Sequence, residues 1–316
     1  MKENVTENKL VWHIAGVGAL GSLIAGSFQQ QGLGVRLILK NEAQFASYQN
    51  SGLTILKDER VVTAHPQAVT LDDLGSQPIH YLLCCVKVYD ITNLLIRLKN
   101  NLNAKSIILL IHNGLGVLNE IKKHLPQLRV ISGVSTVGAY LEKAFTVRAF
   151  LNGKFYLGQG IGKFTPNETK TICAAFAAAA LPYQWLDNIQ PILWEKFAIN
   201  CSINLLTALL GCKNGALLSH QKILKQLTSE AAQVLCAYGV NMSADDLFCK
   251  VIDVIEGTAD NYSSMYKDVE NNKQTEIYYL NERLMTLAHQ KELVTPTHSE
   301  LLNKFYRTFP KQTFGG

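Results

Sequence analysis

The chain has 316 residues, of which 47% are hydrophobic, and carries a formal net charge of +5. This length predicts two domains, and this composition excludes a disordered chain. The charge is spread thinly, and no basic run interleaved with aromatic residues indicates a nucleic-acid surface. The mild basicity fits an anionic small ligand as well as plain solubility.

The cysteines and the chain start favour an intracellular location. The seven cysteines are scattered and form no CxxC pair, so neither a zinc site nor a disulfide framework is indicated. Reduced thiols are typical of the cytoplasm, and the polar start MKENVTENKL lacks the apolar core of a secretory signal. The apolar stretch 174–181 is too short to cross a bilayer. We therefore expect a cytoplasmic protein with no metal centre, no membrane partner and no nucleic-acid partner.

A glycine-rich motif opens the chain. The apolar run 10–15 predicts a buried strand, and a helix is predicted to extend to about residue 31. Six residues join the two: Gly16, Val17, Gly18, Ala19, Leu20 and Gly21. In this GxGxxG pattern the first glycine permits a tight turn, the second lets the backbone approach a pyrophosphate and the third packs helix against strand. Because a helix N-terminus also offers amide donors to an anion, the motif predicts a dinucleotide site.

The second predicted strand, 35–39, ends at Lys40. A cofactor with a free ribose 2'-hydroxyl usually meets an Asp or Glu at this position. A cation there suits a 2'-phosphate, which favours NADP over NAD. Two alternatives stay open: Glu42 lies close enough to serve a hydroxyl, and Lys40 can be an ordinary solvated loop residue.

Two later strands also end in polar residues. The apolar run 81–86 is followed by Lys87, and the run 106–111 is followed by His112 and Asn113. Ligands of open α/β sheets bind at the carboxyl ends of the strands. Since Lys40, Lys87 and Asn113 all fall at such ends, together they support a cofactor site there. Asn113 alone has an equally good interpretation as a turn residue before a glycine.

Other short elements complete the first half. Strand 130–134 leads into the segment 135–139. The predicted remainder is a hairpin formed by 53–56 and 61–63, a hairpin around Asn152-Gly153 joining 149–151 to 155–157, a helix over 170–180 and a strand over 183–186. These elements predict an α/β domain over residues 1–187.

Helical periodicity dominates residues 188–316, which we expect to form an all-helical second domain. Pro191 is well placed to start its first helix. That helix carries Lys196, Asn200 and Asn204 at intervals of four, so they form one polar ridge among apolar residues. Burying a cation and two amides without partners is costly, which suggests that the ridge holds a polar ligand. The alternative is a surface lysine that extends along apolar neighbours, and the pattern alone does not decide between the two.

Further helices are predicted over 221–238, 244–255, 265–289 and 298–306. In this scheme Glu276 is by default a solvated charge on a long helix. Either Ser263 or Ser264 serves as a helix N-cap.

Four segments resemble the ketopantoate reductase (2-dehydropantoate 2-reductase) family: GVGALG at 16–21, HNGLG at 112–116, KFAINCSIN at 196–204 and SSMYKDVENNKQTEI at 263–277. The resemblance covers nearly the whole chain. It implies an α/β N-terminal Rossmann-type dinucleotide-binding domain followed by an all-α C-terminal domain of the 6-phosphogluconate dehydrogenase C-terminal-like type. It also implies NADPH-dependent reduction of ketopantoate to pantoate, on the route to pantothenate and coenzyme A.

The resemblance also implies roles for single residues. Lys196 would be the general acid. The substrate-binding residues would be Asn113, Asn200, Asn204, Asn214 and Ser264. Besides the glycine loop, the cofactor contacts would be Lys40, Lys87, Asn113, Ala139 and Glu276. Two departures are visible: His112 replaces a frequent glutamine, and Leu205 replaces a frequent proline that can influence substrate preference.

Two alternative functions and one question of assembly remain open at this point. An NADP-dependent reductase of another small 2-ketoacid would share every motif. A catalytically silent NADP-binding sensor would be expected to have lost the lysine or the acid, and this chain has both Lys196 and Glu276. A homodimer formed through the helical domain stays open, because no sequence feature demonstrates it.

Overall fold

The computed structural model describes residues 10–57 and 60–312. The chain divides into two compact units: Met1–His112 with Val117–Ile189, and Asn113–Gly116 with Gln190–Gly316. The domain boundary expected between residues 187 and 188 stays a prediction. Sequence reasoning kept Asn113–Gly116 with the nucleotide domain, whereas in the structure this segment groups with the helical unit.

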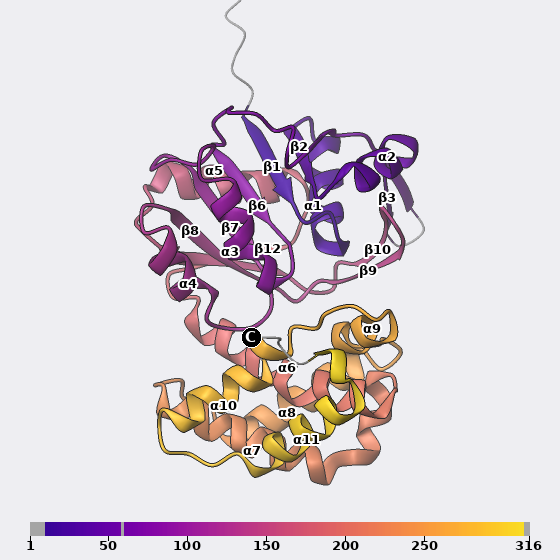
Figure 1. The fold of residues 1–316 in the computed structure, drawn as a ribbon, viewed down its shortest axis with the longest axis vertical. Coiled ribbons are helices and arrows are strands. Elements are labelled where there is room, and N and C mark those ends of the chain that lie inside the picture. The colour runs from indigo at the N-terminus through magenta and orange to yellow at the C-terminus, as the bar shows by residue number, and fades with distance from the viewer. Residues whose placement is uncertain (1–9, 58–59, 313–316) are drawn as a thin grey trace, which may run out of the picture. The chain divides into compact units, whose positions relative to one another are not determined.

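The first unit is built on an eight-stranded sheet with the order β12-β11-β8-β7-β6-β1-β2-β5 (Figure 1). Its strands are β1 (Val11–Ala15), β2 (Gly34–Leu39), β5 (Gln67–Thr70), β6 (Tyr81–Cys84), β7 (Ile107–Ile111), β8 (Arg129–Ser135), β11 (Phe155–Ile161) and β12 (Tyr183–Leu186). Neighbouring strands are parallel except β8 and β11, which are antiparallel. Central strands such as β7 are buried throughout, as their continuous apolar runs predict.

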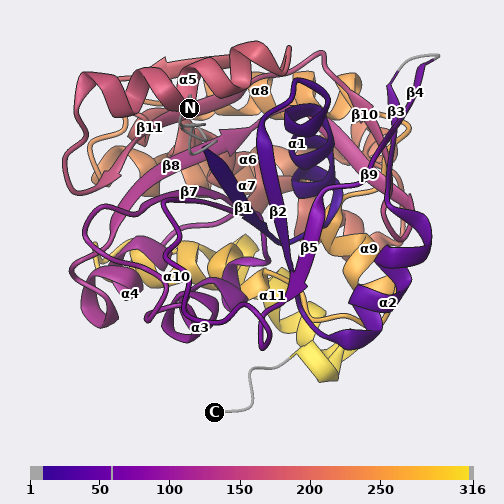
Figure 2. The same ribbon diagram turned by 90° about the horizontal axis from the view of Figure 1, so that it is seen from above.

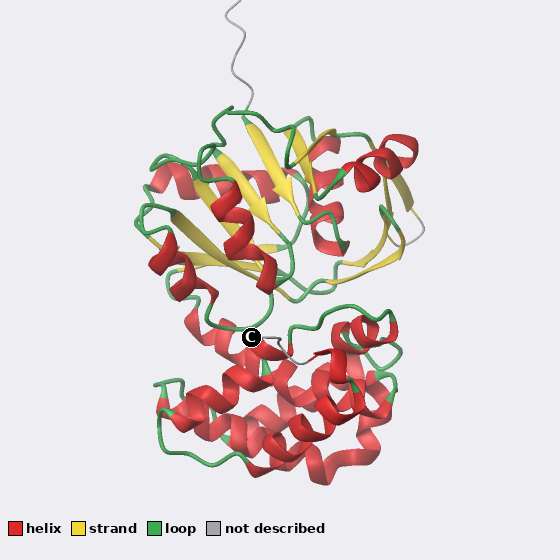
Figure 3. Cartoon of the chain, in the orientation of Figure 1, coloured by secondary structure: helices red, strands yellow, loops and turns green. Residues whose placement is uncertain are grey.

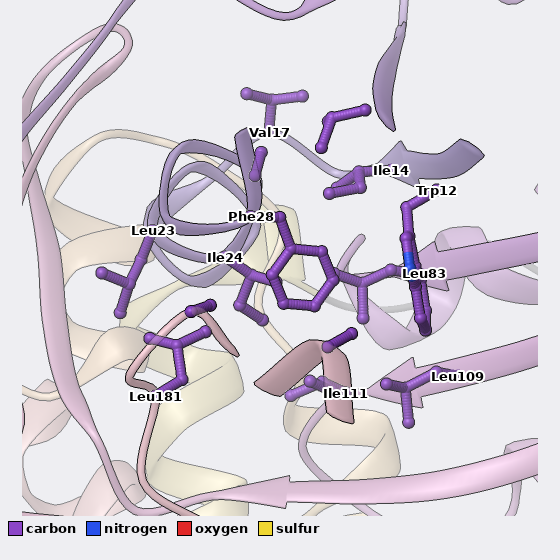
Figure 4. Packing of buried hydrophobic residues seen from close by; sticks show 14 of the residues in the cluster. Trp12, Ile14, Val17, Leu23, Ile24, Phe28, Leu83, Leu109, Ile111 and Leu181 are labelled. Carbon is purple, nitrogen blue, oxygen red and sulfur yellow. The ribbon is translucent and has the colours of Figure 1, made fainter. Parts of the chain in front are cut away.

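Helices cover both faces of this sheet. They are α1 (Ala19–Gln30), α2 (Glu42–Ser51), α3 (Val88–Arg97), α4 (Val117–His124) and α5 (Pro166–Ala178). Helices α1 and α5 pack on each other, as do α3 and α4, and Figure 2 shows the two pairs on opposite faces. In the core, the ring centroid of Phe28 of α1 lies 5.3 Å from that of Trp12 of β1 (Figure 4). It lies 5.5 Å from the ring centroid of Phe176 of α5.

A second sheet of four strands has the order β4-β3-β10-β9. Its strands are β3 (Leu53–Lys57), β4 (Arg60–Ala64), β9 (Gly138–Lys143) and β10 (Thr146–Phe150). The predicted hairpin of β3 and β4 is confirmed. The hairpin predicted around Asn152-Gly153 is wrong, because β10 pairs with β3 and β9 while β11 belongs to the other sheet. Instead, the Thr136 amide donates to the Lys154 carbonyl, and the Lys154 amide donates to the Thr136 hydroxyl oxygen. The two segments lie so close that a Cβ at Gly153 would lie 2.2 Å from the Thr136 carbonyl oxygen.

The second unit is helical (Figure 3). Its elements are α6 (Gln190–Leu210), η1 (Asn214–His220), α7 (Gln221–Ala237), α8 (Ala244–Gly257), α9 (Ser264–Glu270), η2 (Ile277–Tyr279), α10 (Asn281–His289), α11 (Pro296–Thr308) and η3 (Pro310–Gln312). Helix α6 contacts each of α7 to α11, and 12 of its 21 residues are buried. A helix that is apolar on nearly all sides is expected at the centre of a bundle.

The long helix predicted over 265–289 is wrong. The chain instead forms α9, a loop, η2 and α10. Helix α9 ends at Glu270, with Asn271 as its C-cap. The next residue, Asn272, has a left-handed φ of 53°, and the amide of Lys273 donates to the carbonyl of Asp268. The Gln312 side chain holds the following loop by accepting from the Thr275 amide and donating to the Lys273 carbonyl, both at 2.8 Å.

No single helix in the described part of the chain is long and apolar enough to span a membrane, although α6 and Asn214–Ala237 pass that test together as a pair bent by 95°. Within residues 10–57 and 60–312, no three His, Cys, Asp or Glu side chains gather in a way that could hold a metal ion.

A buried carboxylate fixes the start of α11. Glu230 of α7 accepts hydrogen bonds from the amides of Thr297 and His298 at 2.7 and 3.0 Å, and its carboxylate lies 2.8 Å from Nδ1 of His298. Burial by itself raises the pKa of Glu230, but the hydrogen bonds from His298 and Thr297 outweigh burial and lower this pKa to about 2. The ionised carboxylate therefore stabilises the folded state.

We expect Glu230→Ala to lower the free energy of unfolding by about 2 kcal/mol, because buried donors at the start of α11 lose their acceptor. Urea denaturation at neutral pH measures this change. Since the folded pKa of Glu230 is depressed, its contribution is present above about pH 4.5 and is lost as the pH falls towards 2. The exposed Glu300→Ala on the same α11 is the control; equal losses in both variants at neutral pH would contradict the prediction.

Candidate active site

The glycine loop follows β1 in the first unit. Gly16 has a φ of +86°, and a Cβ there would lie 2.3 Å from the Val86 nitrogen. A Cβ at Gly21 would lie 2.1 Å from the carbonyl oxygen of Gly16. These two glycines are therefore required by the protein's own packing. At Gly18, by contrast, a Cβ would meet nothing within 4 Å, so this stretch of backbone has an open side.

The start of α1 is chemically suited to an anion. Gly18 is the N-cap, no side chain caps the helix and its first turn carries no acidic residue. The backbone amides of Ala19 and Leu20 thus lie at a helix N-terminus that attracts negative charge. Val17 is buried and packs into the core below the loop.

Two lysines flank this loop on the neighbouring strands. Strand β1 lies between β2 and β6, and Lys40 follows β2 while Lys87 follows β6 as the N-cap of α3. The three strands are parallel, so their carboxyl ends share one edge of the sheet, where strand order changes direction along the chain. Ala139 lies on β9, half-buried against the core of the same unit.

Glu42, the acid that could bind a free ribose 2'-hydroxyl in place of Lys40 binding a 2'-phosphate, lies near other carboxylates. Desolvation, a hydrogen bond with Asp73 and repulsion from Asp73 and Asp72 all raise the pKa of Glu42. Asn41 caps α2 by accepting from the Gln44 amide at 2.9 Å, which fixes the turn after Lys40. Sequence reasoning missed α2, because Tyr48 is its one buried residue and no apolar stripe marks it.

In the second unit, Lys196 of α6 lies in the field of Glu276, which precedes η2. Burial lowers the pKa of Lys196 to about 8, and the nearby negative charge of Glu276 opposes that fall. Glu276 is itself buried, with 5% of its surface exposed, so it is not the solvated helix charge expected from the sequence.

Asn113 joins this group through the HNGLG segment. Its Nδ2 donates to Oε2 of Glu276 at 3.1 Å. The segment is held in place because the Leu115 amide donates to the Tyr279 carbonyl at 3.1 Å. Gly114, with a φ of +84°, is needed there, since a Cβ would lie 2.5 Å from that carbonyl oxygen. Residues more than 150 positions apart in the sequence thus meet around one carboxylate.

Asn200 and Asn204 lie one and two turns beyond Lys196 on α6, and Asn204 is buried. The backbone between them receives an additional hydrogen bond, because Nδ2 of the fully buried Asn281 donates to the Cys201 carbonyl at 2.8 Å. Sequence reasoning missed Asn281, because the segment LNERLM mixes polar and apolar residues and does not mark its asparagine as buried. Leu205 continues the helix without a break.

Asn214 and Ser264 differ in their surroundings. Asn214 begins η1 and is buried, with 8% of its surface exposed. Ser264 is the exposed first residue of α9. The N-cap of this helix is Ser263, whose Oγ accepts from the Tyr266 amide at 3.1 Å and from the Thr207 hydroxyl at 2.7 Å. The capping role left open between the two serines therefore belongs to Ser263.

Two family models match the chain. Residues 12–162 match "Ketopantoate reductase PanE/ApbA", and residues 188–306 match "Ketopantoate reductase PanE/ApbA C terminal". Among curated relatives, the 2-dehydropantoate 2-reductase of Vibrio cholerae is 32% identical over 91% of this chain and 94% of its own length. The enzyme of the same name from Escherichia coli O157:H7 is 30% identical over 93% of each chain.

Solved structures share the fold. A D-mandelate dehydrogenase in a ternary structure with NADH and anilino(oxo)acetate superposes with a TM-score of 0.87 at 21% identity, covering 96% of this chain and 99% of that one. A PanE/ApbA family ketopantoate reductase from Ralstonia eutropha superposes with a TM-score of 0.85 at 23% identity, with the same coverage. With both halves matched by the family models and a relative above 30% identity, the chain belongs to the ketopantoate reductase family.

Proposed function

We propose that this chain catalyses the NADPH-dependent reduction of 2-dehydropantoate to pantoate, a step towards pantothenate and coenzyme A. The observation that carries the proposal is Lys196, whose pKa of about 8 suits a general acid near neutral pH. Family membership supplies the reaction, and Lys196 supplies the group that can perform it.

Reduction of a ketone places growing negative charge on the carbonyl oxygen. An ammonium group aimed at that oxygen stabilises the transition state more than the ground state. Lys196 can also transfer its proton there, and a pKa lowered by burial makes that transfer easier than from an ordinary lysine. The negative charge of Glu276 raises the pKa of Lys196 and so opposes the effect of burial. With a pKa of about 8, the lysine remains mostly protonated near neutral pH.

The other polar residues of the second unit would hold the substrate. Asn200 and Asn204 can orient its hydroxyl and carboxylate through neutral amides, which add no charge that competes with Lys196. Asn214 and Ser264 would bind substrate as well. Asn113 would contact both substrate and cofactor, and its hydrogen bond to Glu276 supports this role by fixing its amide.

When bound, NADPH supplies the hydride. The open backbone at Gly18 and the uncapped start of α1 fit a pyrophosphate, and the residues of this loop are Gly16, Val17, Gly18, Ala19, Leu20 and Gly21. Lys40 and Lys87 would bind the 2'-phosphate, Ala139 would make a further cofactor contact, and Glu276 would lie near the nicotinamide ribose.

A second candidate function is reduction of another small 2-ketoacid. Leu205, where the family often has proline, is the observation that favours it, because it lies directly after Asn204. A silent NADP-binding sensor has less support, since Lys196 and Glu276 interact in the structure. The proposal includes a cytoplasmic location, which the seven free cysteines support, and leaves a homodimer to be tested by light scattering.

Lys196→Ala should lower kcat/KM for 2-dehydropantoate by at least about 100-fold, because removing a comparable oxyanion donor costs about 3 kcal/mol. The decrease in NADPH absorbance measures the rate. Lys222→Ala removes an exposed lysine of α7 and is the control. Near-normal turnover of Lys196→Ala would refute its role as general acid.

The pH dependence tests the coupling between Lys196 and Glu276. We expect kcat/KM to fall as the pH rises through about 8, because the protonated lysine is then lost. Glu276→Gln removes the charge that raises this pKa, so the alkaline limb of the pH profile should move to lower pH. Glu256→Gln, on the exposed side of α8, should leave the limb in place. If the alkaline limb of the pH profile does not move in Glu276→Gln, the charge of Glu276 does not influence the pKa of Lys196.

Cofactor preference tests Lys40. Lys40→Ala should reduce the ratio of kcat/KM for NADPH to that for NADH by about tenfold, the loss expected for one charge-assisted contact. The exposed Lys99→Ala is the matched control. If the ratio stays constant in Lys40→Ala, the lysine is an ordinary surface residue and does not read the 2'-phosphate.

A further inference from the structure

Asn214 is anchored by its backbone against the segment that follows α8. Its amide donates to the Asn261 carbonyl at 2.9 Å, and the next amide, of Gly215, donates to the Ala259 carbonyl at 3.0 Å. The two segments approach so closely that a Cβ at Gly215 would lie 2.9 Å from the Ala259 Cβ. The position of Asn214 is thus set by the backbone, and the orientation of its amide remains to be fixed.

Thr258 fixes that orientation. Its hydroxyl lies 2.5 Å from the Val254 carbonyl oxygen, which can only accept, so the single hydroxyl hydrogen is donated there. The Thr258 Oγ1 can then only accept from Asn214, at 2.9 Å. The Asn214 amide must therefore turn its NH₂ group towards Thr258, and this conclusion follows from the direction of the hydrogen bonds alone.

The carbonyl oxygen of the same amide is left as an acceptor. The Asn214 Oδ1 is buried and has no hydrogen-bond partner among the described residues. A buried acceptor without a donor is costly, which calls for a ligand group that donates. In 2-dehydropantoate the ketone and the ionised carboxylate only accept, and the hydroxyl on carbon 4 is the one donor.

We propose that Thr258 is a positioning residue that fixes the Asn214 amide with its carbonyl oxygen towards the substrate's hydroxyl, and so selects 2-ketoacids that carry this hydroxyl. This inference rests on the proposed function. A site built to bind a hydroxyl rejects the analogue that lacks it, because its buried polar group is then left without a partner.

The test compares 2-dehydropantoate with 3,3-dimethyl-2-oxobutanoate, which differs by lacking the hydroxyl. The readout is the ratio of kcat/KM for the two substrates with saturating NADPH. The wild type should favour the hydroxylated substrate by at least about 100-fold. Thr258→Val should reduce this preference by about tenfold or more, because the amide can then flip, and Thr258→Ser, which keeps the hydroxyl, should retain it within about twofold.

A double-mutant cycle separates positioning from a general structural effect. In an Asn214→Ala background, Thr258→Val should leave the ratio unchanged, since there is no amide left to orient. The ratio is measured within each variant, so a partly unfolded sample does not alter it. If Thr258→Val is insoluble, Thr258→Ala carries the same prediction.

The outcomes distinguish this inference from the function on which it rests. A wild type that reduces neither substrate would refute the proposed function. A wild type that reduces both equally, or a Thr258→Val variant that keeps the full preference, would refute the role of Thr258 while the reductase activity stands. An equal loss of preference in the Asn214→Ala background would also refute it.

Discussion

Burial of polar groups on α6 is the constraint on which the second unit depends. The helix contacts each of α7 to α11, so polar side chains on it are removed from water. Some are satisfied on the helix itself, as when the Ser202 hydroxyl donates to the Ala198 carbonyl. Glu276 partly offsets the cost of burying the Lys196 amine, and Asn281 donates to the helix backbone at Cys201, between Asn200 and Asn204. The same burial that costs stability lowers the pKa of Lys196 towards the range in which an acid is useful. Burial of Lys196 thus accounts both for a cost in stability and for the lowered pKa of its amine.

The first unit obeys a different constraint, close approach of backbone to backbone. Gly16 and Gly21 are required by the protein's own packing, whereas Gly18 has open space beside it. The glycine motif thus contains two positions that the protein's own packing requires and one that the packing leaves open. The open position lies where strand order changes direction, the point at which α/β sheets bind nucleotides. Lys40 and Lys87 flank it because their strands are the neighbours of β1.

The wrong predictions share a cause, which is that local signals do not say what a segment pairs with. Asn152-Gly153 reads as a hairpin turn, yet the strands on either side join different sheets. Helical composition over 265–289 hides a break that Gln312, far along the chain, holds through the loop backbone. Helix α2 has almost no buried residue, so no apolar periodicity marked it. Tertiary contacts decided the first two cases, whereas the start of α2 is fixed locally by its Asn41 cap.

By itself, the sequence determined the order of most strands and helices, the α/β then all-α architecture, and the spacing of Lys196, Asn200 and Asn204, because apolar periodicity and glycine spacing are local properties. It also indicated the family through its motifs. Only the tertiary structure decided that Glu276 is buried beside Lys196, that Asn113 reaches it, and that Thr258 fixes the Asn214 amide. These facts depend on which distant segments meet, and on the direction of hydrogen bonds between them, neither of which residue spacing encodes.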